Sequence, residues 1–162
     1  MGQARNITGI VTAGRGVYKD NLFVVQDGTG PWSGIHVLDP SYSLPAETGD
    51  SVTISGKVIE YYGLTELMVF SGCYQEHSSG NPVPEPLLVA TGTLNTSSPS
   101  AERYEGVLIR VDSVTVTNDS LGYGEWEIND GSGPCIVDDD AYYFYTPRLN
   151  DCLLYTSDAA DE

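Results

Sequence analysis

The stretch VVQDGTGPWSGIHVLD, Val24 to Asp39, has two short apolar runs on either side of a glycine-rich turn. Gly28 and Gly30 permit backbone conformations with positive φ at no steric cost, so the stretch predicts a β-hairpin. The same turn returns 103 positions later, where Asp130-Gly131-Ser132-Gly133-Pro134 matches Asp27-Gly28-Thr29-Gly30-Pro31. A turn that recurs in this way predicts that the β-module around it recurs as well.

Alternating apolar residues outside this hairpin predict further strands. The segments that carry the pattern are ITGIVTA at 7–13, DSVTISGKVIEYYG at 50–63 and LTELMVF at 64–70. Gly9 and Gly56 lie inside two of them, where a bend or bulge is the usual reason for a strand glycine. No segment has a convincing helical period. The fold class predicted is therefore all-β, with a five-stranded barrel over residues 3–72.

The second half of the chain repeats part of this pattern. Residues 73–100 are polar and proline-rich at their start and predict a linker, with one possible strand in LLVATGTL at 87–94. In YEGVLIRVDSVTVTN, at 104–118, the apolar parity switches near Asp112–Ser113, which predicts a bulge. Trp126 and Ile128 are expected to point inward. Residues 101–151 thus predict a second, incomplete barrel.

The last eleven residues, CLLYTSDAADE at 152–162, share nothing with what precedes them. They are similar to the translated end sequence of a transposase-based sequencing-library adapter. We therefore expect that the natural protein continues beyond Asp151, and that the fourth and fifth strands of the second module are missing here.

Charge is the strongest compositional signal. The chain has 23 acidic and 7 basic residues, a formal net charge of −16. Such a surface repels phosphate backbones at long range and favours cations and basic partners. No apolar run is long enough for a membrane span, and no segment resembles a signal peptide.

The side chains that usually carry chemistry do not form a recognisable motif. His36 and His77 have no triad-like neighbours in the sequence, and no cofactor is predicted. Cys73, Cys135 and Cys152 lack metal-ligand spacing; a Cys73–Cys135 disulfide is possible, but unpaired thiols are favoured. Asp138, Asp139 and Asp140 are expected to point to alternate faces as a solvated patch, so no metal site is predicted.

The quoted segments ITGIVTA, LFVVQDGTGPWSGIHV, GDSVTISGKVIEYYGLTEL and YEGVLIRVDSVTV resemble OB-fold-like modules of large secreted bacterial proteins, often extracellular nucleases. The resemblance covers nearly all of residues 3–151 and implies two tandem modules, the second truncated. It also implies an extracellular or cell-surface location. The catalytic residues of such nucleases lie in a different domain, so no catalytic residue is carried over.

OB folds bind oligonucleotides or oligosaccharides on the face of strands two and three, helped by loops after strands one and four. Aromatic rings at those places can stack on bases or sugars. The candidate ligand-binding residues are Tyr18, Lys19, Trp32, Tyr61 and Tyr62. A packing role for Trp32 and at least one tyrosine is the alternative.

We therefore expect a non-catalytic binding or accessory module of a secreted or surface protein, presenting nucleic acid to a downstream nuclease. The alternative is a structural spacer, or a carbohydrate-binding or adhesion module. The expected partners are single-stranded nucleic acid or a glycan, together with neighbouring domains of the parent chain. An enzyme in its own right has no support in the sequence.

Overall fold

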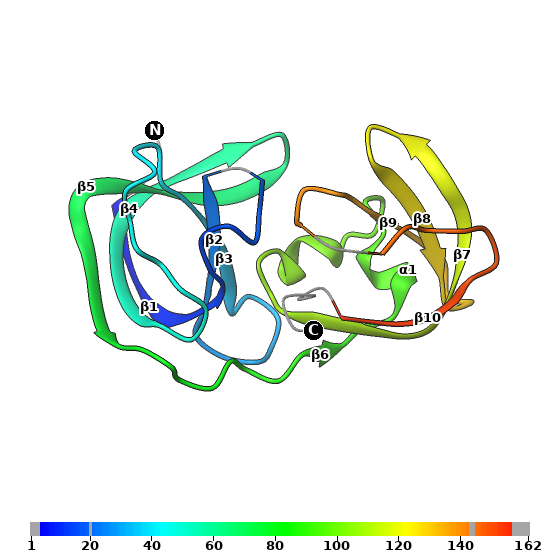
Figure 1. The fold of residues 1–162 in the computed structure, drawn as a ribbon, viewed down its shortest axis with the longest axis horizontal. Coiled ribbons are helices and arrows are strands. Elements are labelled where there is room, and N and C mark those ends of the chain that lie inside the picture. The colour runs from blue at the N-terminus through cyan, green and yellow to red at the C-terminus, as the bar shows by residue number, and fades with distance from the viewer. Residues whose placement is uncertain (1–3, 20, 143–144, 157–162) are drawn as a thin grey trace.

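The first half of the chain forms a closed five-stranded barrel. The computed structural model describes residues 4–19, 21–142 and 145–156. The barrel strands are β1 (Ala4–Ala13), β2 (Leu22–Gln26), β3 (Gly34–Leu38), β4 (Ser51–Tyr61) and β5 (Leu64–Ser78). They close in the order β1-β2-β3-β5-β4, and every neighbouring pair is antiparallel except β3 and β5, which are parallel (Figure 1).

The barrel interior is filled by the apolar residues that alternate along the strands. Ile7, Ile35 and Val58 are partly buried and pack against this core. The buried core consists of Val11, Phe23, Val25, Val37, Ala46, Val52, Ile54 and Leu67. Because successive strand side chains point to opposite faces, this inward set leaves a second, outward set on β2 and β3.

The two strand glycines lie where neighbouring backbones come close. A Cβ on Gly9 would lie 2.5 Å from the carbonyl oxygen of Gln26, and one on Gly56 would lie 2.5 Å from that of Met68. The β4–β5 register shifts beside Gly56, as expected for a bulge. In β1 the shift falls between Val11 and Ala13 instead. Glycine is therefore required at both positions for close approach, and only Gly56 marks a bulge.

The fifth strand is longer than the sequence pattern predicted. The expected strand ended at Phe70 and the linker began at Cys73, yet β5 continues to Ser78. Gly72, at φ 76°, lies in a wide irregularity of this strand, after which Tyr74–Ser78 pairs with the first half of β4. The polar sequence of this part has no clear alternation, because most of its side chains are exposed. Backbone pairing with β4 keeps it in the sheet.

The connection to the second half holds little of the strand that was expected at residues 87–94. Only β6 (Leu87–Leu88) is a strand, and it pairs with β7 in parallel. A single helical turn, α1 (Thr91–Leu94), follows, and then a 3-10 turn, η1 (Ala101–Tyr104). The helical turn is set by contacts of its first residue with a distant hairpin, which the local pattern does not encode.

The second half forms a curled, open sheet with its own core. Its strands are β7 (Ile109–Gly122), β8 (Glu125–Asn129), β9 (Pro134–Val137) and β10 (Cys152–Thr156), in the order β10-β7-β8-β9. This is the order β4-β1-β2-β3 of the barrel. The core consists of Val111, Val114, Val116, Trp126 and Ile128. The predicted all-β fold, a barrel followed by an incomplete second barrel, is confirmed.

The predicted bulge in the first strand of this sheet is also confirmed. Ser113 has a φ of 54°, and the β7–β10 register skips one β7 residue between Val111 and Val114. Both valines are therefore buried although their spacing is odd.

The residues after Asp151 do take part in the fold. We expected the strand position beside β7 to be empty, but Cys152–Thr156 occupies it as β10, antiparallel to β7. Backbone hydrogen bonding to a strand edge depends little on side-chain identity, so sequence dissimilarity did not preclude pairing. The remainder of this segment, 157–162, lies outside the described residues. Among the described residues, no helix is long and apolar enough to cross a membrane.

Candidate functional site

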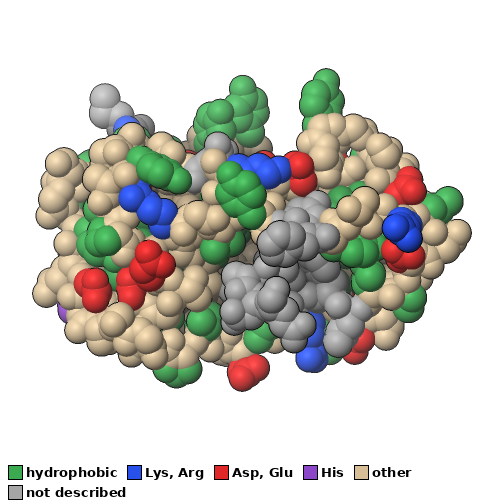
Figure 2. Space-filling model, in the orientation of Figure 1, with side chains coloured by type: hydrophobic (Ala, Val, Ile, Leu, Met, Phe, Trp, Pro, Cys, Tyr) green, Lys and Arg blue, Asp and Glu red, His purple; other side chains and the backbone are tan. Residues whose placement is uncertain are grey.

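The five candidate ligand-binding residues fall into two groups. Trp32 and Tyr62 lie in barrel turns and Tyr61 ends β4, and these side chains are 70%, 95% and 59% exposed, respectively. Tyr18 and Lys19 lie in the β1–β2 loop and contact the second half of the chain. Hydrophobic side chains stand out from the tips of the β4–β5 and β7–β8 hairpins in the space-filling view (Figure 2).

Tyr61 and Tyr62 form an aromatic pair at the tip of the β4–β5 hairpin. Tyr62 has a φ of 48° and Gly63 a φ of 88°, the two consecutive positive values of a tight hairpin turn. The two rings meet edge to face with centroids 4.7 Å apart. Tyr62 also borders a hollow of about 710 Å³ whose charged lining residues are Glu60, Glu102 and Glu105. This hollow is therefore acidic.

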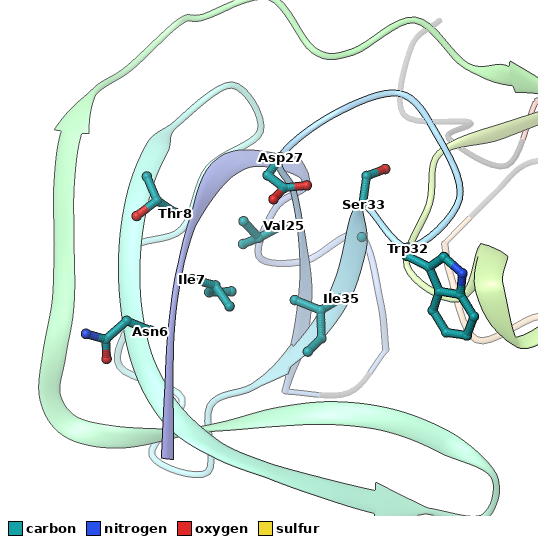
Figure 3. A pocket seen from close by; sticks show the side chains of 9 residues that line it. Asn6, Ile7, Thr8, Val25, Asp27, Trp32, Ser33 and Ile35 are labelled. Atoms are coloured by element: carbon teal, nitrogen blue, oxygen red, sulfur yellow. The ribbon is translucent and has the colours of Figure 1, made fainter. Parts of the chain in front are cut away.

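Trp32 is held out of the β2–β3 loop by its backbone. Its φ of 67° is unusual for a bulky residue, and its N–H donates to the Arg103 carbonyl oxygen at 2.7 Å. The residue lies at the rim of a hollow of about 280 Å³. Figure 3 shows the apolar floor of this hollow, made by Ile7, Val25 and Ile35.

The β1–β2 loop is fastened to the segment after β9. Tyr18 forms a β-bridge with Ala141, and the Lys19 N–H donates to the Asp140 carbonyl oxygen at 2.7 Å. The Lys19 ammonium lies 2.7 Å from the Asp139 carboxylate. Arg15, the other cation beside Tyr18, is 3.3 Å from Asp39. Both positive charges of this loop are thus paired within the chain.

Asp39 organises the loop that follows β3. Burial acts to raise its pKa, but hydrogen bonds from Leu44, Ser41 and Ser43 to the carboxylate hold the pKa below its usual value. The neighbouring Arg15 guanidinium also stacks over the Tyr42 ring, with 4.2 Å to the centroid. Arg15 is therefore engaged on two sides.

The outer face of β2 and β3 is covered by the segment that leads into β7. Gln26 is 1% exposed, and its side-chain oxygen accepts a hydrogen bond from the Leu108 N–H at 2.9 Å. Gly34 and Gly106 touch through their backbones, because a Cβ on Gly34 would lie 1.7 Å from the Gly106 oxygen. The second half therefore covers much of this face and leaves a hollow of about 280 Å³ beside Val24 and His36.

His36 lies on this covered face. Its ring meets the edge of Tyr18 at 5.9 Å, and burial lowers its pKa to about 4. No described residue forms a hydrogen bond with its Nδ1, and its neighbour across the β3–β5 pair, Glu66, is 3% exposed. By contrast, a ring nitrogen of His77 lies 2.8 Å from the exposed Thr53 hydroxyl.

The aspartates after β9 converge, contrary to the expectation that they alternate. Carboxylate oxygens of Asp138, Asp139 and Asp140 lie within 4.8 Å of one another. The alternation argument was wrong here because β9 ends at Val137, so these residues follow the strand rather than belong to it. The Lys19 ammonium offsets one of the three charges.

The cysteines are free thiols in the structure. Burial raises the pKa of Cys135 to about 11, so its thiol is protonated and a poor nucleophile.

Sequence reasoning missed Gln26, Gly34, Gly106 and Leu108, which define how the barrel contacts the second sheet. Gly34 and Gly106 carry the one local signal, since a glycine outside a tight turn often marks close backbone approach. Their pairing joins positions more than seventy residues apart and has no pattern in the sequence.

No family model matches the chain. One known protein is similar to most of the chain. The chain is 30% identical over 150 residues to an endonuclease, in an alignment that covers 90% of the chain. That protein is Endonuclease YhcR of Bacillus subtilis (strain 168), and the chain spans 12% of its length.

Proposed function

We propose that this chain is a non-catalytic accessory region of a larger nuclease-type protein, and that its OB-fold-like barrel contacts single-stranded nucleic acid. The observation that carries the proposal is the exposure of Trp32, Tyr61 and Tyr62 on the loops of a closed five-stranded barrel. The similarity to an endonuclease over most of the chain supports the association with a nuclease. The shared strand order of the two halves supports tandem modules.

Stacking supplies the binding energy in this proposal. A base stacked on an aromatic side chain contributes about 1–3 kcal/mol, whatever its identity. The cations Arg15 and Lys19 are already paired with aspartates, so they offer phosphates little attraction. Binding should therefore weaken as salt rises, but with a shallow slope. Tyr18 and Lys19 form the edge of the proposed site next to the second sheet, where Tyr18 is half-buried and Lys19 is exposed but paired with Asp139.

Fluorescence anisotropy with labelled single-stranded DNA at low salt tests this role. Trp32→Ala and Tyr62→Ala should each weaken binding by roughly 5- to 100-fold, the loss of one stacked base. Tyr123→Ala is the matched control, because Tyr123 is fully exposed at the tip of the other hairpin. Absence of binding at low salt, or equal losses in all three variants, would refute the nucleic-acid role.

A structural spacer, or a carbohydrate-binding or adhesion module, is the second candidate. Two observations favour it: the formal net charge of −16, and the use of the outer β2–β3 face for contact within the chain. For both candidate functions we propose that the parent protein lies outside the cell or at its surface. Binding of neutral glycans with little dependence on salt would select this candidate over the first.

A further inference from the structure

The strands β1 and β2 separate at the end of the barrel that carries Trp32. β1 pairs with β4 from Ala4 to Ile10, whereas its pairing with β2 begins only at Ile10. Residues 6–8 of β1 therefore have a strand partner on one side only, among the residues that the structure describes. A hollow of about 280 Å³ lies between this part of β1 and the residues that flank the β2–β3 turn (Figure 3). We call it the Trp32 hollow.

The Trp32 hollow has an apolar floor and a polar rim. The floor residues Ile7, Val25 and Ile35 belong to the barrel core or pack against it, so the hollow opens at the mouth of the barrel and not on the outer β2–β3 face. At the rim, the Asp27 carboxylate accepts no hydrogen bond and meets no cation among the described residues. The Ser33 hydroxyl donates to a carbonyl oxygen within the turn, and its own oxygen can still accept a hydrogen bond. Both rim side chains therefore offer acceptors.

Trp32 supplies an exposed aromatic surface at this rim. Its side chain is 70% exposed, so most of the indole lies in water. Its backbone has a φ of 67°, a conformation that costs a bulky residue free energy. Burial of the ring within the described part of the chain does not offset this cost. A backbone outlier of this kind favours a ligand that covers the ring.

The charges around the Trp32 hollow disfavour an anionic ligand. None of the described residues that line the hollow is a lysine, an arginine or a histidine. Asp27 brings a negative charge to the rim, and the whole chain has a formal net charge of −16. A phosphate group is therefore repelled at this position. The hollow suits an uncharged ligand that donates hydrogen bonds.

We propose that the Trp32 hollow binds one sugar residue of a neutral glycan. A pyranose ring has C–H groups on its faces, which pack on the indole and on the aliphatic floor. It has hydroxyl groups at its edge, which donate to Asp27 and Ser33. The volume of about 280 Å³ lies near about 300 Å³, the lower limit of common ligand pockets, so a single ring fits. This inference rests on the second candidate function, a carbohydrate-binding module, and gives that function a site.

An NMR titration with neutral trisaccharides tests the proposal. Maltotriose, cellotriose and tri-N-acetylchitotriose are each added to the whole ¹⁵N-labelled chain up to about 10 mM, the range in which the contact of a single ring is measurable. The Trp32 indole N–H signal and the amide signals of Asp27 and Ser33 should shift and saturate with at least one of the three sugars. The Trp126 indole, which is completely buried, is the internal reference.

Matched variants make the result specific. Asp27→Asn should weaken sugar binding by about tenfold, the loss of a charge-assisted hydrogen bond, and Trp32→Ala by at least as much. Glu85→Gln removes the same charge from an exposed position elsewhere and should leave the sugar affinity unchanged. Tyr62→Ala should weaken DNA binding but not sugar binding, because Tyr62 does not line the hollow. Asp27→Asn should not weaken DNA binding, so a failure of either role is recognised separately.

Three results would overturn the proposal. One is the absence of saturable shifts with all three sugars. Another is a sugar affinity that is unchanged in Asp27→Asn or in Trp32→Ala. The third is a stronger response of the Asp27 and Ser33 amides to a nucleotide such as thymidine monophosphate, which would assign the hollow to a nucleic-acid base instead.

Discussion

Replacing Thr91 with valine tests how much the contact between Thr91 and Asp130 stabilises the second sheet. This contact joins α1 to the turn between β8 and β9. Valine has nearly the same shape as threonine and lacks the hydroxyl, so packing at this fully buried position is kept. The Thr91 hydroxyl lies 2.8 Å from an Asp130 carboxylate oxygen and 2.6 Å from the Gly133 carbonyl oxygen, so the variant loses the one donated hydrogen bond that these two acceptors share. It also loses the acceptor for the Asp130 N–H, which lies 3.1 Å from the hydroxyl oxygen.

The expected cost follows from these two losses. A hydrogen bond to a charged group contributes about 1.5–3 kcal/mol, and a buried N–H left without an acceptor costs about 1–2 kcal/mol more. We expect the free energy of unfolding of the second sheet to fall by about 3 kcal/mol. In urea this lowers the midpoint by roughly 1–3 M with an unchanged slope.

Tryptophan fluorescence reports this transition directly. Trp126 is completely buried in the core of the second sheet, and Trp32→Phe removes the only other tryptophan. Thr93→Val is the matched control, since Thr93 lies in the same helical turn and its side chain makes no hydrogen bond to a described residue. A loss below about 0.5 kcal/mol, or one equal to that of Thr93→Val, would refute the reasoning, because it would match an ordinary surface change.

Two further predictions concern the contact between the barrel and the second sheet. Burial depresses the pKa of His36 from 6.5 to about 4, so the free energy of unfolding should be highest above pH 6.5 and fall by roughly 3 kcal/mol as the pH falls to 4. His36→Gln should flatten this pH profile in urea unfolding. A His36→Gln profile equal to that of His77→Gln would contradict the prediction. Gly34→Ala should separate the barrel from the second sheet, because its Cβ would lie 1.7 Å from the Gly106 oxygen. Gly28→Ala is the control, since its Cβ would meet only the Ser33 Cβ at 3.5 Å. Small-angle scattering should show a larger radius of gyration for Gly34→Ala alone, and equal radii for the two variants would contradict the contact.

The positions of the candidate aromatics could be predicted, but not their surroundings. The tight-turn sequence around Tyr62 and Gly63 placed two tyrosines at a hairpin tip, where they are exposed. Lys19 looked like a local positive charge because its partner Asp139 lies 120 residues away. An ion pair between loops of different modules has no sequence pattern, so the charge available to a ligand could not be read in advance.

Alternation of apolar residues sets which face of a strand is buried, so β1 to β4, the first half of β5, and β7 to β9 could be predicted from the sequence, whereas β10 could not. A hairpin at each copy of the turn and the bulge at Ser113 could also be predicted, but the two turns differ: Gly131 and Gly133 have positive φ, whereas Gly28 and Gly30 do not. Three features could not be predicted in this way: β5 continues to Ser78, Thr91 begins a helical turn, and the second half packs on the outer β2–β3 face. Each of these depends on hydrogen bonds or backbone contacts between residues far apart in the chain, which local propensity does not specify.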